Sequence, residues 1–365
     1  MDFYMPVKLF TGIGCIASHV NDLCTLGRKC LIVTGRNSAL KSGALDDVTS
    51  ACDTACIQYV IFNGITENPS VTSCMEAGIF ASKEKVDFIV GIGGGSPLDA
   101  AKAVSVFAAN PELDEKAFYN KEWSISPLPI VLVGTTAGTG SEVTDVSVLT
   151  DSVGRKHSIH DPRMFASISF GNPLYTVSLP NAVTASSGID VIAHCTESYF
   201  SKKANELSRA FSVRGVSRAW KPLEKLASGQ ELSLEDRTAL YEASILGGLA
   251  ICITGTCFPH NVGYYLTENY QVPHGIACAF FLSDLLDHAF RTDEEYANGL
   301  FVSAGVDVEK INDLVDTLLP KLGIHMTDEQ IIAVLPRWEN NGSVRNTIGS
   351  IDTAYISDAL KRHFQ

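Results

Sequence analysis

The sequence has 365 residues, of which 45% are hydrophobic and 19% are charged, so it is long enough for two domains and can bury a large core. Its formal net charge of -13 predicts an acidic surface, which repels nucleic-acid phosphates and anionic lipid. These values argue against a protein that binds nucleic acid or a membrane surface, and they leave a small-molecule partner open.

The ten cysteines form no CxxC pair and no zinc-ribbon cluster. Several lie in apolar runs, such as Cys278 between Ala277 and Ala279, so we expect them to be small buried hydrophobes in a reducing compartment. The first residues do not resemble a signal peptide, and no apolar run reaches the roughly 20 residues that cross a bilayer. The expected location is the cytoplasm.

The first half of the chain alternates short apolar runs with helical patterns. Runs rich in β-branched and aromatic residues predict strands that are buried on both faces, at 30–34, 58–62, 87–91 and 129–133. Helical patterns lie between them, at 38–55, 70–85 and 97–109. This alternation predicts an α/β domain with a parallel sheet over residues 1–175.

A glycine-rich turn, residues 93–102, follows the third predicted strand. Its three glycines allow the backbone to turn tightly and to approach a ligand closely. We expect Ser96 to be the N-cap of the next helix and Asp99 to complete a capping box. A strand, a glycine turn and a helix N-terminus together predict a pyrophosphate site. The alternative is a tight turn without a ligand, because the segment matches neither GxGxxG nor a P-loop.

A second polar loop, residues 134–144, follows the next predicted strand. Its threonines, Thr135, Thr136 and Thr139, and its glycines offer hydrogen-bonding groups to phosphate or ribose. Taken alone, the loop could be an ordinary polar turn. Because both loops follow neighbouring buried strands, we expect them to share one crevice at the carboxyl ends of the sheet.

The pattern changes from about Leu179, and we place the domain boundary near the turn-forming residues 171–173. Strand-like runs then disappear, and long helical stretches occupy 204–226 and 233–252. Residues 176–365 are therefore predicted to form an all-α domain.

Asp190 and His194 are four residues apart in a predicted helix, which places both side chains on one face. The residues between them are apolar, so the pair is expected to be buried, where an unpartnered carboxylate is costly. A bound metal ion would remove that cost, and a simple hydrogen bond between the two side chains would remove it too. The pair alone favours the structural explanation.

His260 and His274 both follow prolines, and His274 opens an apolar helical run over 276–286. A histidine at the start of a helix can be exposed and without function. One aspartate and three histidines together, however, make a mixed oxygen and nitrogen ligand set for a divalent transition metal such as Fe(II), Zn(II) or Mn(II).

Taken together, these motifs resemble the iron-containing (group III) alcohol dehydrogenases over nearly the whole chain. The resemblance is carried by the glycine turn with Asp99 and Lys102, by residues 134–144, by Asp190 with His194, and by His274 between Pro273 and Gly275. It implies a Rossmann-like dinucleotide domain followed by an all-helical metal domain, the architecture shared with dehydroquinate synthases. It also implies a homodimer or a larger homo-oligomer.

The resemblance further implies a set of site residues. The metal ligands would be Asp190, His194, His260 and His274, with His260 identified by its separation of 14 residues from His274. The dinucleotide contacts would be Gly94, Gly95, Ser96, Asp99, Thr135, Thr136, Thr139 and, near the nicotinamide ribose, Lys156. The implied cofactors are Fe(II), with Zn(II) or Mn(II) as alternatives, and NADP or NAD.

Tyr264 departs from the family pattern. Many members have a second histidine four residues after the third ligand, where it contacts the cofactor or relays protons, and this chain has a tyrosine there. The tyrosine hydroxyl could take over the relay, which makes Tyr264 a candidate catalytic residue. A small branch that includes phosphonoacetaldehyde reductases has a similar pattern, so that substrate is an alternative.

A second departure affects the choice of cofactor. Members that prefer NAD carry an aspartate after the first strand, where this chain has Gly35, Arg36 and Asn37. An acidic residue there accepts a hydrogen bond from the ribose 2′-hydroxyl of NAD and repels the 2′-phosphate of NADP. Its absence, together with a nearby arginine, leads us to expect that NADPH is accepted, and we hypothesise that it is preferred. The alternative is that Arg36 points into solvent.

The expected reaction is hydride transfer between a nicotinamide and a small alcohol or aldehyde, with a metal ion polarising the carbonyl oxygen. Two other enzyme classes share the architecture. Glycerol dehydrogenases usually use fewer ligands and zinc, and dehydroquinate synthases need many basic residues. A dinucleotide- and metal-binding protein without enzymatic activity would be expected to lack part of the ligand set, and none of the four residues is missing.

Overall fold

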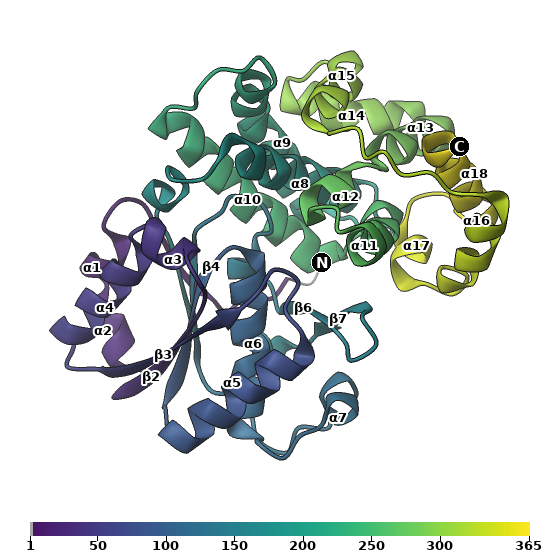
Figure 1. Cartoon of the computed structure of the whole chain (residues 1–365). Helices are drawn as coiled ribbons and strands as arrows, with labels where there is room; N and C mark the ends of the chain where they lie inside the picture. The colour runs from purple at the N-terminus through teal and green to yellow at the C-terminus, as the bar shows by residue number, and fades with distance from the viewer. Residues whose placement is uncertain (1–2) are drawn as a thin grey trace. The chain divides into compact units, whose positions relative to one another are not determined.

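A computed structural model describes residues 3–365, which form two compact units (Figure 1). The first unit ends at Pro180, and the second comprises Asn181–Gln365. The division lies at 180/181, whereas the sequence analysis placed it at 175/176.

The first unit contains a six-stranded, entirely parallel sheet with the order β1-β8-β5-β4-β2-β3. Its strands are β1 (Lys8–Thr11), β2 (Lys29–Gly35), β3 (Gln58–Ile65), β4 (Phe88–Gly93), β5 (Ile130–Gly134) and β8 (Ile168–Gly171). A separate antiparallel pair consists of β6 (Val146–Thr150) and β7 (Lys156–His160).

The central strands β4 and β5 are buried at every residue, which is why their sequences are continuous apolar runs. The four strands predicted from the sequence are confirmed, but the prediction that all four are buried on both faces is wrong for β3, which lies at the edge of the sheet and has only Ile65 buried. The prediction did not include β1 and β8, which have only four residues each. The β1 strand also lies at the edge of the sheet and is only partly buried, so its apolar pattern is weak.

Helices cover both faces of the sheet (Figure 1). The helices of this unit are α1 (Cys15–Ser18), α2 (Val20–Cys24), α3 (Ser38–Lys41), α4 (Ala44–Thr54), α5 (Val71–Glu84), α6 (Gly95–Ala109) and α7 (Glu115–Tyr119), with 3₁₀ turns η1 (Ser141–Val143), η2 (Pro162–Met164) and η3 (Pro173–Thr176). The single helix predicted over 38–55 is divided into α3 and α4, because Gly43 between them adopts a left-handed conformation with φ 81°.

The second unit is helical, as predicted. Its helices are α8 (Asn181–Tyr199), α9 (Glu206–Ala227), α10 (Leu234–Thr254), α11 (Phe258–Tyr270), α12 (His274–Ala279), α13 (Leu282–Thr292), α14 (Glu294–Ala304), α15 (Glu309–Leu318), α16 (Asp328–Val334), α17 (Gly342–Asn346) and α18 (Thr353–Phe364), with the 3₁₀ turn η4 (Leu335–Arg337). The apolar run predicted as one helix over 276–286 is divided between α12 and α13.

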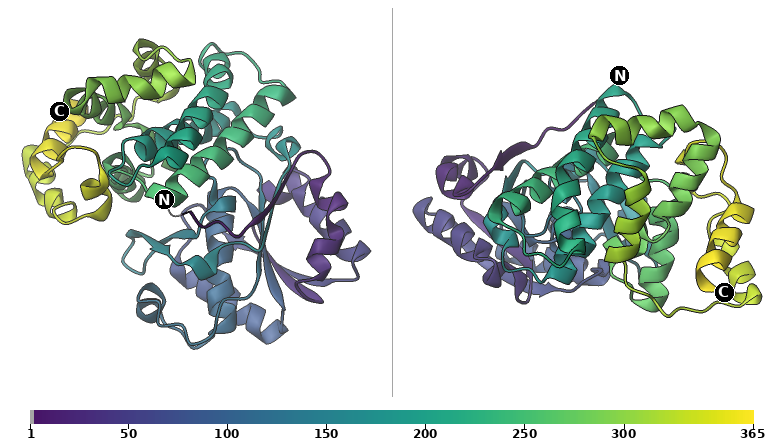
Figure 2. Two further views of the ribbon diagram at one scale, coloured as in Figure 1. Left: turned by 180° about the vertical axis from the view of Figure 1, so that it is seen from behind. Right: turned by 90° about the horizontal axis from the view of Figure 1, so that it is seen from above.

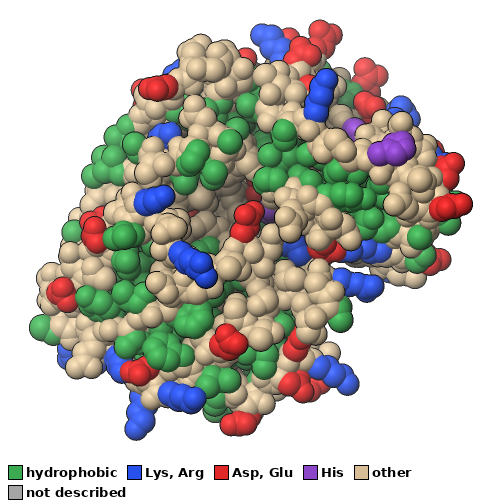
Figure 3. Space-filling model, viewed as in Figure 1, with side chains coloured by type: hydrophobic (Ala, Val, Ile, Leu, Met, Phe, Trp, Pro, Cys, Tyr) green, Lys and Arg blue, Asp and Glu red, His purple; other side chains and the backbone are tan. Residues whose placement is uncertain are grey.

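Helices α8, α9 and α10, the teal segments of the second unit, pack side by side (Figure 2). Every residue of α8 from Gly188 to Tyr199 is buried, including its polar side chains. The face of the molecule in Figure 3 carries both acidic and basic side chains among hydrophobic ones. Within residues 3–365, no single helix is long and apolar enough to cross a bilayer, and α10 with α11 meets that test only as a pair bent by 109°.

Candidate metal centre and cofactor loops

Helix α8 presents Asp190 and His194 on one buried face. The two side chains are one helical turn apart, and the residues are only 2% and 4% exposed. The Oδ1 atom of Asp190 lies 4.0 Å from Nε2 of His194. Burial opposes ionisation of Asp190, but the charges of His194 and His274 and a contact with His260 outweigh it, so the pKa of the carboxyl is well below its usual range.

Glu197, one turn further along α8, orients His260. Its Oε1 atom lies 2.5 Å from Nδ1 of His260, and its Oε2 atom accepts a hydrogen bond of 2.7 Å from the backbone N–H of Cys257. Because an ionised carboxylate only accepts hydrogen bonds, Nδ1 carries the hydrogen, and Nε2 presents its lone pair on the other side of the ring. There, Nε2 faces Oδ1 of Asp190 at 3.5 Å.

Helix α12 contributes His274 at its first position and Cys278 one turn later. The imidazole rings of His260 and His274 are arranged edge to face, with ring centroids 5.6 Å apart. The ring of His194 stacks on that of His260, with ring centroids 4.6 Å apart. One ligand atom from each of four residues, Asp190, His260, His274 and Cys278, lies within 4.8 Å of the other three.

Two glycines allow α12 to approach its neighbours closely. A Cβ atom on Gly275 would lie 2.0 Å from the carbonyl oxygen of Ser186 in α8. A Cβ atom on Gly263 of α11 would lie 2.6 Å from the carbonyl oxygen of Ala277 in α12. No larger residue fits at either position without moving a backbone. The two contacts therefore fix the helix that carries His274 and Cys278.

This cluster fits a divalent transition metal ion. The facing atoms, Oδ1 of Asp190 and Nε2 of His260, are buried, and neither makes a hydrogen bond to a described residue. Burial disfavours the charged form of His260, but Cys278 and Glu197 outweigh it and raise the pKa of the imidazole well above its usual value. The surroundings thus favour a positive charge at this point, and a metal ion would supply one.

Of the four residues predicted as metal ligands, the structure brings Asp190, His260 and His274 into one group of ligand atoms. His194 is not part of that group, but its ring stacks on His260 and its Nε2 atom lies 4.0 Å from Asp190. Sequence reasoning missed Glu197 and treated Cys278 only as a small apolar residue. Their spacing was a usable signal, since Glu197 lies two turns after Asp190 and Cys278 lies one turn after His274.

Tyr264 lies one turn after His260 on α11 and is half-buried. Its ring centroid is 5.7 Å from that of His274. The structure therefore places this side chain at the edge of the histidine cluster.

The glycine turn and the second polar loop lie against each other, as predicted. Gly93 pairs with Gly134 at the ends of β4 and β5. A Cβ atom on Gly95 would lie 2.6 Å from the side chain of Thr139, and one on Gly94 would lie 3.1 Å from that of Thr136. The side chains of Thr136 and Thr139 thus pack directly against the backbone of the turn.

The predicted capping role of Ser96 is wrong. The N-cap of α6 is Gly94, and the helix begins at Gly95, so Ser96 lies inside the first turn. Its hydroxyl accepts a hydrogen bond from the backbone N–H of Asn68 instead. Gly94 has the extended conformation usual for an N-cap and makes no side-chain capping hydrogen bond.

Asp99 does not complete a capping box either. Its Oδ1 atom accepts a hydrogen bond of 2.7 Å from Ser141, and its Oδ2 atom accepts one of 3.0 Å from the backbone of Val148. The buried Lys102 donates to Ser141 at 2.7 Å and to the carbonyl of Val146 at 2.8 Å. These bonds join α6 to the second loop and to β6.

The other predicted cofactor residues lie at separate points of the first unit. Arg36 and Asn37 follow β2 and are exposed, and Gly35 is partly buried. Thr135 is buried. Lys156, on β7, donates a hydrogen bond of 3.0 Å to the side chain of Asn68.

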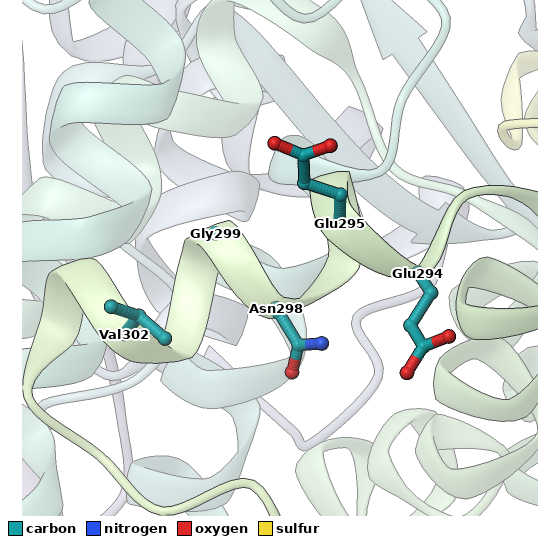
Figure 4. A pocket seen from close by; sticks show the side chains of 5 residues that line it. All are labelled: Glu294, Glu295, Asn298, Gly299 and Val302. Carbon is teal, nitrogen blue, oxygen red and sulfur yellow. The ribbon is translucent and has the colours of Figure 1, made fainter.

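A surface pocket on α14 is unrelated to these residues (Figure 4). Its lining comes from one helix and consists of Glu294, Glu295, Asn298, Gly299 and Val302. Both carboxylates are exposed, so the pocket offers no buried polar group to a ligand.

Comparison with known proteins identifies the family. Residues 6–173 match the model for iron-containing alcohol dehydrogenase, and residues 184–332 match that for the C-terminal domain of the same family. The 1,3-propanediol dehydrogenase of Klebsiella pneumoniae is 35% identical over 77% of this chain and 73% of its own.

Solved structures agree. An iron-containing alcohol dehydrogenase from Thermotoga maritima has a TM-score of 0.91 at 32% identity, covering 100% of this chain and 99% of that one. A sulfoacetaldehyde reductase from Bifidobacterium kashiwanohense in complex with NAD+ has a TM-score of 0.85 at 26% identity, covering 99% and 98%. The chain belongs to the iron-containing alcohol dehydrogenase family and is an oxidoreductase that acts on CH–OH donors.

Proposed function

We propose that the chain interconverts a small aldehyde and its primary alcohol by hydride exchange with a nicotinamide dinucleotide at a metal centre. The observation that carries this proposal is the clustering of the buried Asp190 carboxylate with the buried imidazoles of His194 and His260 and the half-buried imidazole of His274. Glu197 orients the imidazole of His260. The metal ligands proposed are Asp190, His194, His260 and His274, and the proposed ion is Fe(II), with Zn(II) and Mn(II) as alternatives.

A bound divalent ion supplies a Lewis acid that polarises the carbonyl oxygen of an aldehyde. The role of the protein residues would be to hold this ion and to orient the groups around it. Asp190 provides the negative charge of the site, and Glu197 keeps Nε2 of His260 directed toward it. Tyr264, beside His274, is the proposed carrier of the proton that the product alkoxide takes up.

The first unit provides the proposed dinucleotide site. Gly94 and Gly95 have no side chain that could keep a pyrophosphate from the backbone, and the 15-residue helix α6 directs its N-terminal N–H groups to that point. Thr135, Thr136 and Thr139 are further proposed contacts, as is Lys156 near the ribose. Both oxygens of Asp99 already accept hydrogen bonds from the protein, so we assign Asp99 a positioning role.

We also propose that NADPH is preferred to NADH. Arg36 is exposed and makes no ion pair with a described residue, and Gly35 and Asn37 beside it bring no carboxylate. A guanidinium–phosphate pair contributes about 1.5–3 kcal/mol, so Arg36→Ala should lower kcat/KM for NADPH about tenfold or more and leave kcat/KM for NADH nearly unchanged. Steady-state kinetics with both cofactors measures this. Equal efficiencies in the parent protein, unaffected by Arg36→Ala, would contradict the preference.

The substrate class is tested by following NADPH oxidation with acetaldehyde, butyraldehyde and phosphonoacetaldehyde, each with and without added Fe(II). Turnover of the neutral aldehydes supports the proposal, and selective turnover of phosphonoacetaldehyde supports the alternative suggested by Tyr264. An assay of glycerol oxidation tests the alternative that the chain is a glycerol dehydrogenase-like enzyme. His194→Ala should lose both activity and bound metal, and a variant that keeps both would refute the ligand assignment.

A further inference from the structure

Cys278 lies inside the candidate metal centre. It is the fifth residue of α12, one turn after His274, and it is fully buried. Its Sγ atom lies 3.4 Å from Nδ1 and 3.9 Å from Nε2 of His274. Sγ also belongs to the group of four ligand atoms, with those of Asp190, His260 and His274, that all lie within 4.8 Å of one another.

The separations within this group match those between neighbouring ligands of one metal ion. Bonds of about 2.0–2.1 Å to nitrogen or oxygen and 2.3 Å to sulfur place neighbouring ligand atoms about 2.9–3.6 Å apart, from the right angles of five-coordination to the tetrahedral angle. Oδ1 of Asp190 and Nε2 of His260 are 3.5 Å apart, and Sγ of Cys278 is 3.4 Å from the nearer nitrogen of His274. The thiol therefore lies at the separation of neighbouring ligands from Nδ1 of His274, and slightly beyond it from Nε2.

Independent evidence for an ion at this point comes from the other two residues. Oδ1 of Asp190 and Nε2 of His260 are almost completely buried, face each other, and make no hydrogen bond to a described residue. A carboxylate oxygen and an imidazole lone pair repel each other unless a cation or a proton lies between them.

The backbone around Cys278 is also fixed. A Cβ atom on Gly263 would lie 2.9 Å from the Cα atom of Cys278, so α11 and α12 touch at this residue. Cys195 offers a contrast, because it is equally buried but its Sγ packs against the backbone of Gly215, away from any group of ligand atoms. Burial alone therefore does not explain where the thiol of Cys278 lies.

We propose that Cys278 binds the metal ion directly through its thiolate, as a fifth ligand beside Asp190, His194, His260 and His274. The proposal rests on the metal centre of the proposed function and adds a soft ligand to an oxygen and nitrogen set. Thiolate ligands favour Zn(II) and other soft or borderline ions over hard ones. The substitution Cys278→Ala should therefore lower the affinity for Zn(II) more than the affinity for Mn(II).

The test is X-ray absorption spectroscopy of the full-length protein after removal of metal with a chelator and reloading with Zn(II). The expected result is one sulfur neighbour at about 2.3 Å in addition to nitrogen and oxygen at about 2.0–2.1 Å. Cys278→Ala should still bind one Zn(II) but lose the sulfur neighbour, and the matched variant Cys195→Ala should keep it. Loading with Co(II) gives a second reading, a thiolate-to-cobalt charge-transfer band that disappears only in Cys278→Ala.

The outcomes separate this proposal from the proposed function. One bound Zn(II) without a sulfur neighbour in the parent protein overturns the role of Cys278 and leaves the metal centre intact. A sulfur neighbour that survives in Cys278→Ala overturns it as well. A parent protein that binds no metal ion overturns both proposals. Because the parent spectrum decides the first point, the test does not depend on whether Cys278→Ala folds.

Discussion

Glu197 determines which nitrogen of His260 faces Asp190. Its carboxylate lies against Nδ1 at 2.5 Å and is itself held by the backbone N–H of Cys257. A ligand histidine whose second nitrogen is bound to a carboxylate has a fixed ring orientation and a more basic ligand atom. In the proposed metal centre, Glu197 thus acts through His260, as a positioning residue.

We predict that Glu197→Gln weakens metal binding about 10–100-fold, the range found when such supporting residues are removed. The amide keeps the size of the side chain but accepts more weakly, so His260 loses its fixed orientation. Competition with a chromophoric chelator measures the affinity of the purified protein for Zn(II). The matched variant is Glu268→Gln, in the same unit, whose buried carboxylate pairs with Arg337. Unchanged affinity in Glu197→Gln would refute the positioning role.

At this scale the sequence located most of the centre. The spacing of Asp190 and His194 predicted a shared buried face, and the resemblance to the family identified His260 and His274. Glu197 was not singled out, because helical spacing does not reveal which neighbouring helix a side chain meets. Cys278 was classed by its alanine neighbours, and only the position of α12 shows that its thiol lies among polar atoms.

Helix α12 illustrates how packing of elements controls the site. It has only six residues, so it gains little stability from its own hydrogen bonds and depends on contacts with α8 and α11. At Gly275 the backbone of α12 lies directly against that of α8, and at Gly263 the backbone of α11 lies directly against that of α12. The positions of His274 and Cys278 therefore depend on two residues that have no side chain.

We predict that Gly275→Ala displaces α12 and reduces metal occupancy. The added methyl group would lie 2.0 Å from a carbonyl oxygen of α8, and no side-chain rotation can relieve that contact. Overpacking of this kind costs about 1–3 kcal/mol of folding free energy, measured by denaturant unfolding. Gly342→Ala is the control, because its Cβ atom would meet no atom within 4 Å. Full metal content and unchanged stability in Gly275→Ala would show that α12 adapts.

The elements themselves were predictable where burial is complete. Strands β4 and β5 and helices α9 and α10 have long, consistent patterns, and each was predicted. The start of α6 was not, because its N-cap is Gly94, which has no side chain to cap the helix, and Asp99 bonds to residues more than 40 positions away. Such long-range partners leave no local signal in the sequence.

At the scale of the whole molecule, the proposed metal ligands and the proposed dinucleotide contacts belong to different compact units. All of the metal ligands lie in Asn181–Gln365, and the glycine turn and the second loop precede Pro180. The change from alternating strands and helices to helices alone made this division predictable. The position of the division in the chain was less predictable, because the turn-forming residues 171–173 lie at the end of β8 and the unit itself ends only at Pro180.

This division predicts that each ligand protects its own unit. A ligand present at 100 times its Kd stabilises the binding-competent state by about 2.7 kcal/mol, which slows hydrogen exchange through opening of that site about 100-fold. Zn(II) alone should slow exchange in α8, α11 and α12, and NADPH alone should slow it in residues 93–102 and 134–144. Hydrogen exchange with mass spectrometry on the full-length protein resolves these segments, and each ligand is the control for the other. If Zn(II) without nucleotide protected the glycine turn and left α8 and α12 unchanged, the assignment of the metal ligands would be wrong, since stabilisation by binding must appear where the binding residues lie.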